Sequence, residues 1–244
     1  MRNIKLIIEY DGTNYSGWQK QPHQTTIQKT IEDSITKITK EKIEIYGSGR
    51  TDKGVHAKGQ VANFFTGSKI PAERFREAIN SVLPKDIVIS HSEEVDESFH
   101  SRYSAKGKEY RYIIYNRRIS SPLLRNYAYH VPQKLHFDYM KKAVNDFVGT
   151  NDFVAFMASG SSVKDTIRTI HNISLEKDKE IIQLKINGDG FLYNMVRIIL
   201  GTLVDIGIGK IDRDAIPQII LSKDRQKAGH TAPPQGLYLE RVYY

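Results

Sequence analysis

The predicted fold is built around the stretch Gly49-Arg50-Thr51-Asp52-Lys53-Gly54-Val55-His56-Ala57. It lies between residues 43–46 and 60–65, two apolar, β-rich segments that predict strands. Glycines at both ends of the turn permit positive φ angles and let a ligand approach the backbone closely. We therefore predict a strand, a short loop and a second strand, with one carboxylate, that of Asp52, inside the loop.

The side chains of this loop fit chemistry at a single carboxylate. Arg50 and Lys53 are close in sequence to Asp52, and nearby cations favour the ionised form of a carboxylate. An ionised carboxylate in a cleft can act as a nucleophile or a base. The same residue types are also common in ordinary hairpin turns, so the letters alone fit a turn without chemistry. A phosphate-binding loop is excluded, because Val55 and His56 stand where such a loop needs Lys and Ser or Thr.

Outside this stretch, strands and helices alternate through both halves of the chain. Period-two and apolar runs predict strands over residues 4–10, 43–46, 60–65, 87–95, 110–114, 167–175, 181–186 and 237–243. Helical spacing predicts helices over residues 27–38, 71–82, 137–147, 191–206 and 212–221. Residues 120–134 have no clear period and are expected to form a linker. The two halves have a similar order of elements, which suggests an α+β fold made from a duplicated unit.

Composition narrows the class of protein. The 244 residues include no cysteine, which excludes disulfides, thiolate metal sites and a cysteine nucleophile. Lys and Arg number 36 against 28 Asp and Glu, a net charge of +8. Cations with many aromatic rings fit a nucleic-acid partner, but they also fit a basic protein with tyrosines in its core. The longest apolar stretch, residues 191–209, is too short and polar to span a membrane, and we expect a soluble cytoplasmic protein.

Two further features admit both a structural and a functional interpretation. Arg197 stands among apolar residues of a predicted helix, where a buried guanidinium needs a partner. It could form a structural ion pair, reach water, or pair with a catalytic carboxylate such as Asp52. Tyr110 and Tyr112 share one face of a predicted strand, and either could be a core residue or a stacking surface for a base.

Taken together, four regions of the sequence resemble the signatures of the TruA family of tRNA pseudouridine synthases. The regions, in family order, are residues 49–57, residues 99–105 with 108–113, residues 190–197 and residues 231–239. The resemblance runs from residue 4 to residue 242. At position 101 this chain has Ser where the family usually has Ala, which replaces one small residue by another.

The resemblance implies a fold and a set of partners. The fold would have two similar α+β halves whose antiparallel sheets join across a central catalytic cleft. We assign residues 1–104 to the half that carries the Asp52 loop and residues 105–244 to the half that completes the uridine pocket. The expected partner is the anticodon arm of tRNA, and the expected assembly is a homodimer. The resemblance implies no cofactor, no metal and no membrane association.

The resemblance also implies roles for individual residues. Asp52 would be the catalytic carboxylate, attacking either ribose C1′ or the uracil ring. Tyr110 would stack on the uracil and assist proton removal from C5, and Arg197 would pair with Asp52. Arg50 would help to displace the target base from the stack, and Leu237 would line the uracil pocket.

The substrate implied is uridine at positions 38, 39 and 40 of tRNA. Its glycosidic bond would break, the uracil would turn, and C5 would bond to C1′. Two alternatives remain: a non-catalytic RNA-binding protein of the same fold, and a synthase of this family that acts at another RNA position. The first alternative is the less consistent with the presence of Asp52.

Overall fold

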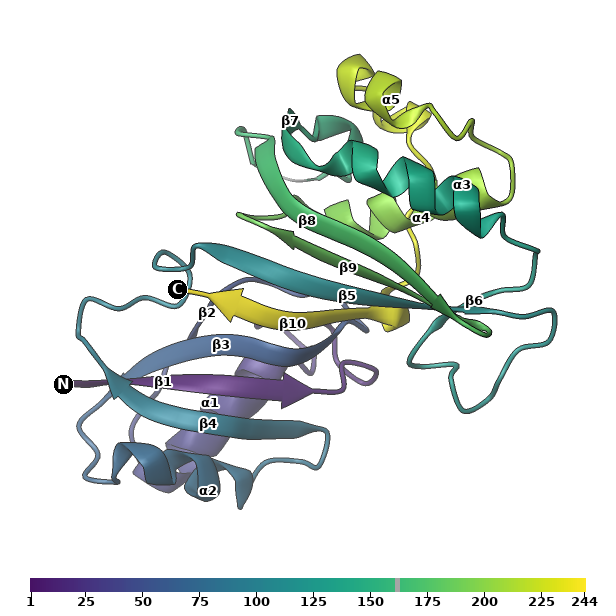
Figure 1. The fold of residues 1–244 in the computed structure, drawn as a ribbon. Coiled ribbons are helices and arrows are strands. Elements are labelled where there is room, and N and C mark those ends of the chain that lie inside the picture. Colours follow the sequence, from purple (N-terminus) through teal and green to yellow (C-terminus); the bar gives the residue numbers. More distant parts are fainter. Residues whose placement is uncertain (161–162) are drawn as a thin grey trace. The chain divides into compact units, whose positions relative to one another are not determined.

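A computed structural model describes residues 1–160 and 163–244. The chain forms two compact units, one of Met1–Lys106 with Tyr238–Tyr244 and the other of Gly107–Leu237. Each unit has a mainly antiparallel sheet and its own helices (Figure 1). The fold class is therefore α+β, as predicted from the sequence.

The sheet of the first unit is centred on β1 (Arg2–Tyr10). This strand pairs antiparallel with β3 (His56–Thr66) on one side and with β4 (Ile87–Val95) on the other. The two-residue strand β2 (Tyr46–Gly47) pairs antiparallel with β3. The last strand, β10 (Leu237–Tyr243), returns to this sheet and pairs parallel to β3 at its first residues. The strand that follows the Asp52 loop is therefore held by three neighbouring strands within this unit.

Two helices complete the first unit. Helix α1 (Ile27–Thr39) runs behind β1 and β4 in Figure 1, and its apolar stripe of Ile27, Ile31 and Ile35 is fully buried. Thr26 caps its first turn, because the Thr26 side chain accepts a hydrogen bond from the Lys29 N–H. A 3₁₀ turn (Ala72–Arg74) leads into α2 (Phe75–Asn80), whose Phe75 packs edge-on against Phe64 of β3 at 5.4 Å.

The second unit is also built on a mainly antiparallel sheet. Its strands follow the order β5 (Gly107–Asn116), β9 (Ile181–Gly188), β8 (Ile167–Asp178) and β7 (Gly149–Asp152). The short strand β6 (Tyr129–Val131) pairs parallel to β5. Helices α3 (Phe137–Ala143), α4 (Met195–Gly207) and α5 (Ile216–Ser222) belong to the same unit, with 3₁₀ turns at Val144–Phe147, Val154–Phe156, Arg225–Lys227 and Pro234–Gly236.

Helix α4 forms the centre of the second unit. All of its residues except Arg197 are buried, so it is apolar on almost every side. It begins after Asn194, whose φ of 60° is left-handed and does not continue a right-handed helix. Across residues 1–160 and 163–244, none of the helices is both long and apolar enough to cross a membrane.

The structure confirms the main elements and corrects several limits. The strand over 87–95 and the strand over 237–243 have the predicted bounds, and α1 extends the predicted helix by one residue. The strand predicted over 43–46 is wrong except at Tyr46. The Ile45 N–H donates to Glu32 of α1, and its carbonyl accepts from Gln28, so its backbone is occupied by helix side chains rather than by a strand.

Other corrections concern the ends of helices and loops. The helices predicted over 71–82 and 137–147 each include a 3₁₀ turn, and those predicted over 191–206 and 212–221 begin at Met195 and Ile216. The proline of α5 lies in its first turn, where a missing N–H costs no helical bond. The linker predicted over 120–134 contains β6. The short strand β7 was not predicted from the sequence.

Candidate active site

The loop between β2 and β3 is fastened at its first residue. Ser48 is buried, its N–H donates to the Val61 carbonyl at 2.8 Å, and its hydroxyl donates to Gln60 Oε1 at 2.7 Å. The Gln60 amide in turn donates to the Gly49 carbonyl at 2.9 Å. Because Gln60 and Val61 belong to β3, the sheet itself fixes where the loop starts.

Thr51 fixes the middle of the loop. This residue is buried, and its hydroxyl lies 2.8 Å from the hydroxyl of Tyr10, which ends β1. The Trp18 N–H donates to the Thr51 carbonyl at 3.0 Å. Burial raises the pKa of Tyr10, so its hydroxyl stays protonated and can donate. The residue directly before Asp52 is thus held by side-chain and main-chain contacts.

Two glycines allow the loop its path. Gly17 has a φ of 89°, and a Cβ placed on it would lie 2.6 Å from the Thr51 carbonyl oxygen. Gly54 has a φ of 79°, a conformation that glycine adopts without strain. A side chain at position 17 would push the loop away from the segment beneath it.

Asp52 and its cationic neighbours lie on the accessible side of this support. The Asp52 side chain is half-buried, whereas Arg50 and Lys53 are exposed. The Asp52 carbonyl accepts a hydrogen bond from the Val55 N–H at 3.1 Å, which closes the turn. An ionised carboxylate on a fixed backbone can act as a nucleophile.

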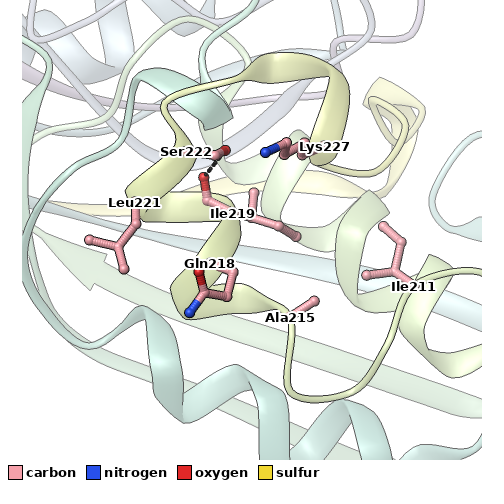
Figure 2. A pocket seen from close by; sticks show the side chains of 7 residues that line it. All are labelled: Ile211, Ala215, Gln218, Ile219, Leu221, Ser222 and Lys227. Carbon is pink, nitrogen blue, oxygen red and sulfur yellow. Dashed lines mark hydrogen bonds between the residues drawn. The ribbon is translucent and has the colours of Figure 1, made fainter.

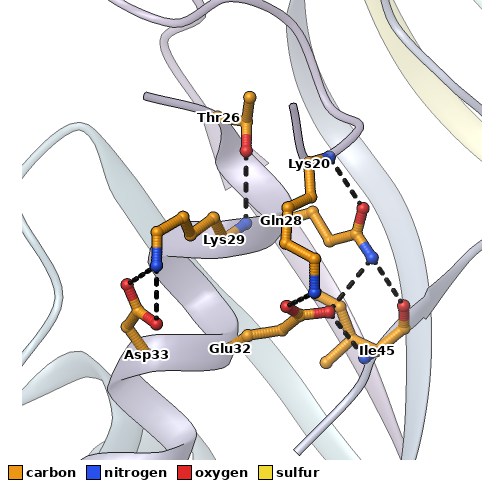
Figure 3. Close-up of polar contacts among 7 residues, drawn as sticks. All are labelled: Lys20, Thr26, Gln28, Lys29, Glu32, Asp33 and Ile45. Atoms are coloured by element: carbon orange, nitrogen blue, oxygen red, sulfur yellow. Dashed lines mark hydrogen bonds and ion pairs between the residues drawn. The ribbon is translucent and has the colours of Figure 1, made fainter. Parts of the chain in front are cut away.

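Helix α1 braces the segment that enters the loop and the segment that follows Trp18 (Figure 3). Glu32, buried on α1, accepts from Lys20 Nζ at 2.8 Å and from the Ile45 N–H at 3.1 Å. Gln28, one turn earlier, accepts from the Lys20 N–H at 3.0 Å and donates to the Ile45 carbonyl. The hydrogen bond to Glu32 raises the pKa of Lys20. The two side chains therefore tie the segment after Trp18 to the segment that enters β2.

Sequence reasoning missed this brace. Gln28 and Glu32 are four residues apart and adjoin the apolar stripe of α1, so they lie on one side of the helix. A polar pair beside a buried stripe is the only signal that the sequence offers. It does not reveal that the partners are Lys20 and Ile45.

His56, the first residue of β3, is a second contact that was not predicted. It is buried, and its Nδ1 accepts a hydrogen bond from the Gly12 N–H at 3.1 Å. Asp11 Oδ1 lies 3.2 Å from the same nitrogen. The imidazole stacks on Tyr238 of β10 with ring centroids 4.8 Å apart. The exit of the loop is thereby packed against the C-terminal strand.

In the second unit, Tyr110 and Tyr112 of β5 are both buried. Tyr112 is fully buried and donates to the Pro233 carbonyl, so it is a core residue. Tyr110 is 8% exposed, and its ring packs edge-on against Phe191 at 5.2 Å. Burial raises the pKa of Tyr112, and the nearby positive charge of Arg197 lessens that rise.

Arg197 is partly buried. It lies in the first turn of α4, where its Nε donates to the Ala232 carbonyl at 2.8 Å and its Nη1 to Asn194 Oδ1 at 2.7 Å. The Ala232 N–H donates back to the Arg197 carbonyl at 3.0 Å. These contacts fix the guanidinium between the helix start and the segment that precedes β10.

Leu237 ends the second unit and is buried. The 3₁₀ turn before it places Gly236 against the Tyr112 ring, where a Cβ would lie 2.4 Å from a ring carbon. Within this unit the structure thus brings β5, the start of α4 and the segment before Leu237 together. Arg50 and Asp52 belong to the first unit, and Tyr110, Arg197 and Leu237 to the second. Their roles stay predictions.

Two other kinds of site, a pocket and a metal site, find less support in the structure. A pocket of about 510 Å³ in the second unit is lined by residues of α5 and its flanking turns (Figure 2), and the lining includes none of the predicted site residues. Its residues are Ile211, Ala215, Gln218, Ile219, Leu221, Ser222 and Lys227. In the part of the chain that the structure describes, no group of three or more His, Asp and Glu side chains is placed to hold a metal ion.

Comparison with known proteins connects these sites to a family. Residues 6–104 and 143–244 match a family model described as tRNA pseudouridine synthase. The tRNA pseudouridine synthase A of Acetivibrio thermocellus is 60% identical over 244 residues, the whole of both chains. The enzyme of that name from Thermoanaerobacter pseudethanolicus is 53% identical over 244 residues, and the tRNA pseudouridine synthase A 2 of Clostridium perfringens is 54% identical over 244 residues, again with full coverage of both chains. The chain belongs to the tRNA pseudouridine synthase family.

Proposed function

We propose that this chain converts uridine to pseudouridine at positions 38, 39 and 40 in the anticodon arm of tRNA. Membership of the tRNA pseudouridine synthase family supports isomerisation of tRNA uridine. The observation that carries the proposal is the half-buried carboxylate of Asp52 on a loop held by Ser48 and Thr51. We propose the cytoplasm as the place of action, since tRNA serves translation there.

In this proposal Asp52 begins the reaction. Its carboxylate adds either to ribose C1′ or to the uracil ring, and the bond between C1′ and N1 breaks. The uracil then turns and C5 bonds to C1′. The bond between Asp52 and the substrate breaks, which regenerates the carboxylate. The C5 proton leaves and N1 gains a proton. Substrate and product are isomers, so the balance needs no second substrate. A uridine in a stem must first leave the base stack, which costs about a few kcal/mol. We assign the exposed Arg50, two residues before Asp52, to offset part of that cost.

The second unit supplies the remaining assigned groups. We assign Tyr110, whose ring is held edge-on by Phe191, to stack on the uracil. Leu237 offers an apolar wall. Arg197 offers a positive charge whose orientation is fixed by Asn194 and Ala232, and we assign it to stabilise the ionised form of Asp52.

The test is the substitution Asp52→Asn, which keeps the shape of the side chain and removes its charge. We expect pseudouridine formation in a tRNA transcript to be lost, with tRNA binding changed by no more than a few-fold. Tritium release from 5-tritiated uridine measures the first quantity and filter binding the second. Lys58→Gln is the control, since it removes an exposed charge on β3 outside the loop and should retain turnover.

Two outcomes would contradict parts of the proposal. Substantial turnover by the Asn variant would remove Asp52 from the catalytic role. Pseudouridine mapped by the wild-type enzyme at sites outside 38, 39 and 40 would leave the isomerase activity standing and change its target.

A further inference from the structure

Three rings in the first unit form a row beside the catalytic loop. The ring centroids of Tyr46 and His100 are 5.3 Å apart, and those of His100 and Tyr103 are 4.4 Å apart. The guanidinium of Arg102 lies 5.7 Å from the centroid of the Tyr103 ring. We name Tyr46, His100 and Tyr103 the aromatic ladder.

The aromatic ladder is exposed at both ends. Tyr103 is 77% exposed and Tyr46 is 36% exposed, and both are among the exposed large apolar side chains of the chain. Exposure of two neighbouring large rings leaves apolar surface in water, which is unfavourable unless a partner covers it. Tyr46 and Tyr103 are therefore not core residues.

The base of the aromatic ladder is rigid. Ser101, between His100 and Arg102, is fully buried, its N–H donates to Asn63 Oδ1 at 2.9 Å, and its hydroxyl contacts Asn63 Oδ1 and the Tyr46 carbonyl. The His100 Nδ1 accepts a hydrogen bond from the Arg102 N–H at 3.1 Å, which fixes the orientation of the ring. The hydroxyl of Ser101, which an alanine would lack, thus helps to hold the ladder against β2.

The aromatic ladder adjoins the catalytic loop along the chain. Tyr46 is four residues before Arg50. Four residues span at most about 14 Å, which is the rise of about four stacked nucleotides at roughly 3.4 Å each. A nucleotide on the Tyr46 ring and one at Arg50 can therefore belong to the same short stretch of RNA.

We propose that the aromatic ladder is a stacking platform for an unpaired nucleotide of the tRNA, within about four nucleotides of the target uridine. This inference rests on the proposed function and adds a subsite to it. Rings stack on any base, and the exposed Arg102 provides a cation for the neighbouring phosphate. The net charge of +8 attracts a polyanion, so RNA is favoured as the occupant over a protein surface with few acidic residues.

The test compares Tyr103→Ala with Tyr103→Phe. Tyr103 is 77% exposed, so its truncation should leave the fold intact, which thermal unfolding followed by circular dichroism will check. We expect Tyr103→Ala to bind a tRNA transcript about tenfold more weakly, a change of about 1.4 kcal/mol. The rate of pseudouridine formation at saturating enzyme should stay within about twofold, and Tyr103→Phe should bind like the wild type, because stacking needs the ring and not the hydroxyl.

The chain offers a matched control at Tyr139 on α3. Its ring stacks on His136 at 5.3 Å, has the Arg213 guanidinium 5.3 Å from its centroid and is 42% exposed, so the chemistry is the same. Tyr139→Ala should leave tRNA binding unchanged. A second readout places 2-aminopurine at single positions around the target uridine. Its fluorescence should fall on binding to the wild type and not to Tyr103→Ala.

The outcomes separate this inference from the proposed function. Normal tRNA binding by Tyr103→Ala, or an equal loss in Tyr139→Ala, would overturn the platform while wild-type turnover still supported the isomerase. Absence of pseudouridine from the wild-type reaction would instead contradict the function. Loss of self-association in Tyr103→Ala, with tRNA binding unchanged, would assign the rings to a protein contact and overturn the inference.

Discussion

At the scale of single residues, the hydroxyl of Thr51 holds the backbone next to Asp52. It is buried and bonded to Tyr10 at 2.8 Å, and its replacement removes one buried hydrogen bond. Thr51→Val should reduce the free energy of unfolding by about 1 kcal/mol, the usual contribution of such a bond. It should also lower kcat by about tenfold, because small displacements of a reacting group are costly.

Thr51→Ser is the control for this prediction, since it keeps the hydroxyl. Urea unfolding and single-turnover kinetics measure the two effects. If Val and Ser variants turned over equally fast, the hydroxyl would have no part in placing Asp52.

Arg197 allows a prediction about pH. Arg197→Met should reduce turnover by about a hundredfold, which is typical when a charge that stabilises the reacting groups is removed. In the proposed pairing Arg197 lies next to the Asp52 carboxylate. Its loss should therefore also move the acid limb of the pH–rate profile to higher pH, because a carboxylate without its cation is protonated more readily.

Arg197→Lys distinguishes charge from structure. Both variants lose the paired contacts to Asn194 and Ala232, so both should be less stable. Only the Met variant should shift the profile. An unshifted profile in Arg197→Met would separate Arg197 from the catalytic carboxylate.

At the scale of elements, α1 acts on the site through Glu32 rather than through its apolar stripe. Glu32→Ala leaves the buried Ile45 N–H without its acceptor, which should cost about 1–3 kcal/mol of unfolding free energy. Turnover should also fall, because Ile45 leads into β2 and the loop. Glu32→Gln keeps an acceptor for the Ile45 N–H and should lose less unfolding free energy and less turnover than Glu32→Ala. Equal stability of the Ala variant and the wild type would contradict the brace.

The ion pair with Lys20 adds a pH signature to the same element. The folded-state pKa of Lys20 is raised above its ordinary value of 10.5. The ion pair therefore contributes its full stabilisation of the folded state below pH 10.5, and this contribution is lost as pH rises through the folded-state pKa. The stability difference between the wild type and Glu32→Gln should therefore narrow when urea unfolding is repeated at alkaline pH. Lys20 is half exposed, so solvent screens the pair and the narrowing should be small.

At the scale of the whole molecule, we predict a homodimer. One chain carries a net charge of +8, and two chains present twice that charge to a long polyanion. Light scattering at micromolar concentration should give twice the monomer mass of 27.9 kDa. Substitutions that disrupt the dimer interface should weaken tRNA binding strongly while they leave the fold of each subunit intact. A monomer that modifies an isolated anticodon stem-loop as fast as full tRNA would contradict the prediction.

The sequence by itself determined the elements whose signal is local. The isoleucine stripe of α1, the strand Ile87–Val95 and the glycine-bracketed loop around Asp52 follow from spacing, side-chain type and turn chemistry within a few residues. The family motifs added the choice of Asp52 as the catalytic candidate. These features need no knowledge of distant partners.

Tertiary structure alone decided the contacts between residues far apart in the chain. Tyr238 of β10 pairs parallel with His56 of β3. The Ile45 N–H donates to the Glu32 side chain instead of to a strand, and the Arg197 guanidinium donates to the Ala232 carbonyl. A buried polar group must find a partner, but which partner it finds depends on how the elements pack. Periodicity predicts which face of an element is buried, but it does not predict which element packs against that face. The support of the Asp52 loop therefore became visible only in the folded chain.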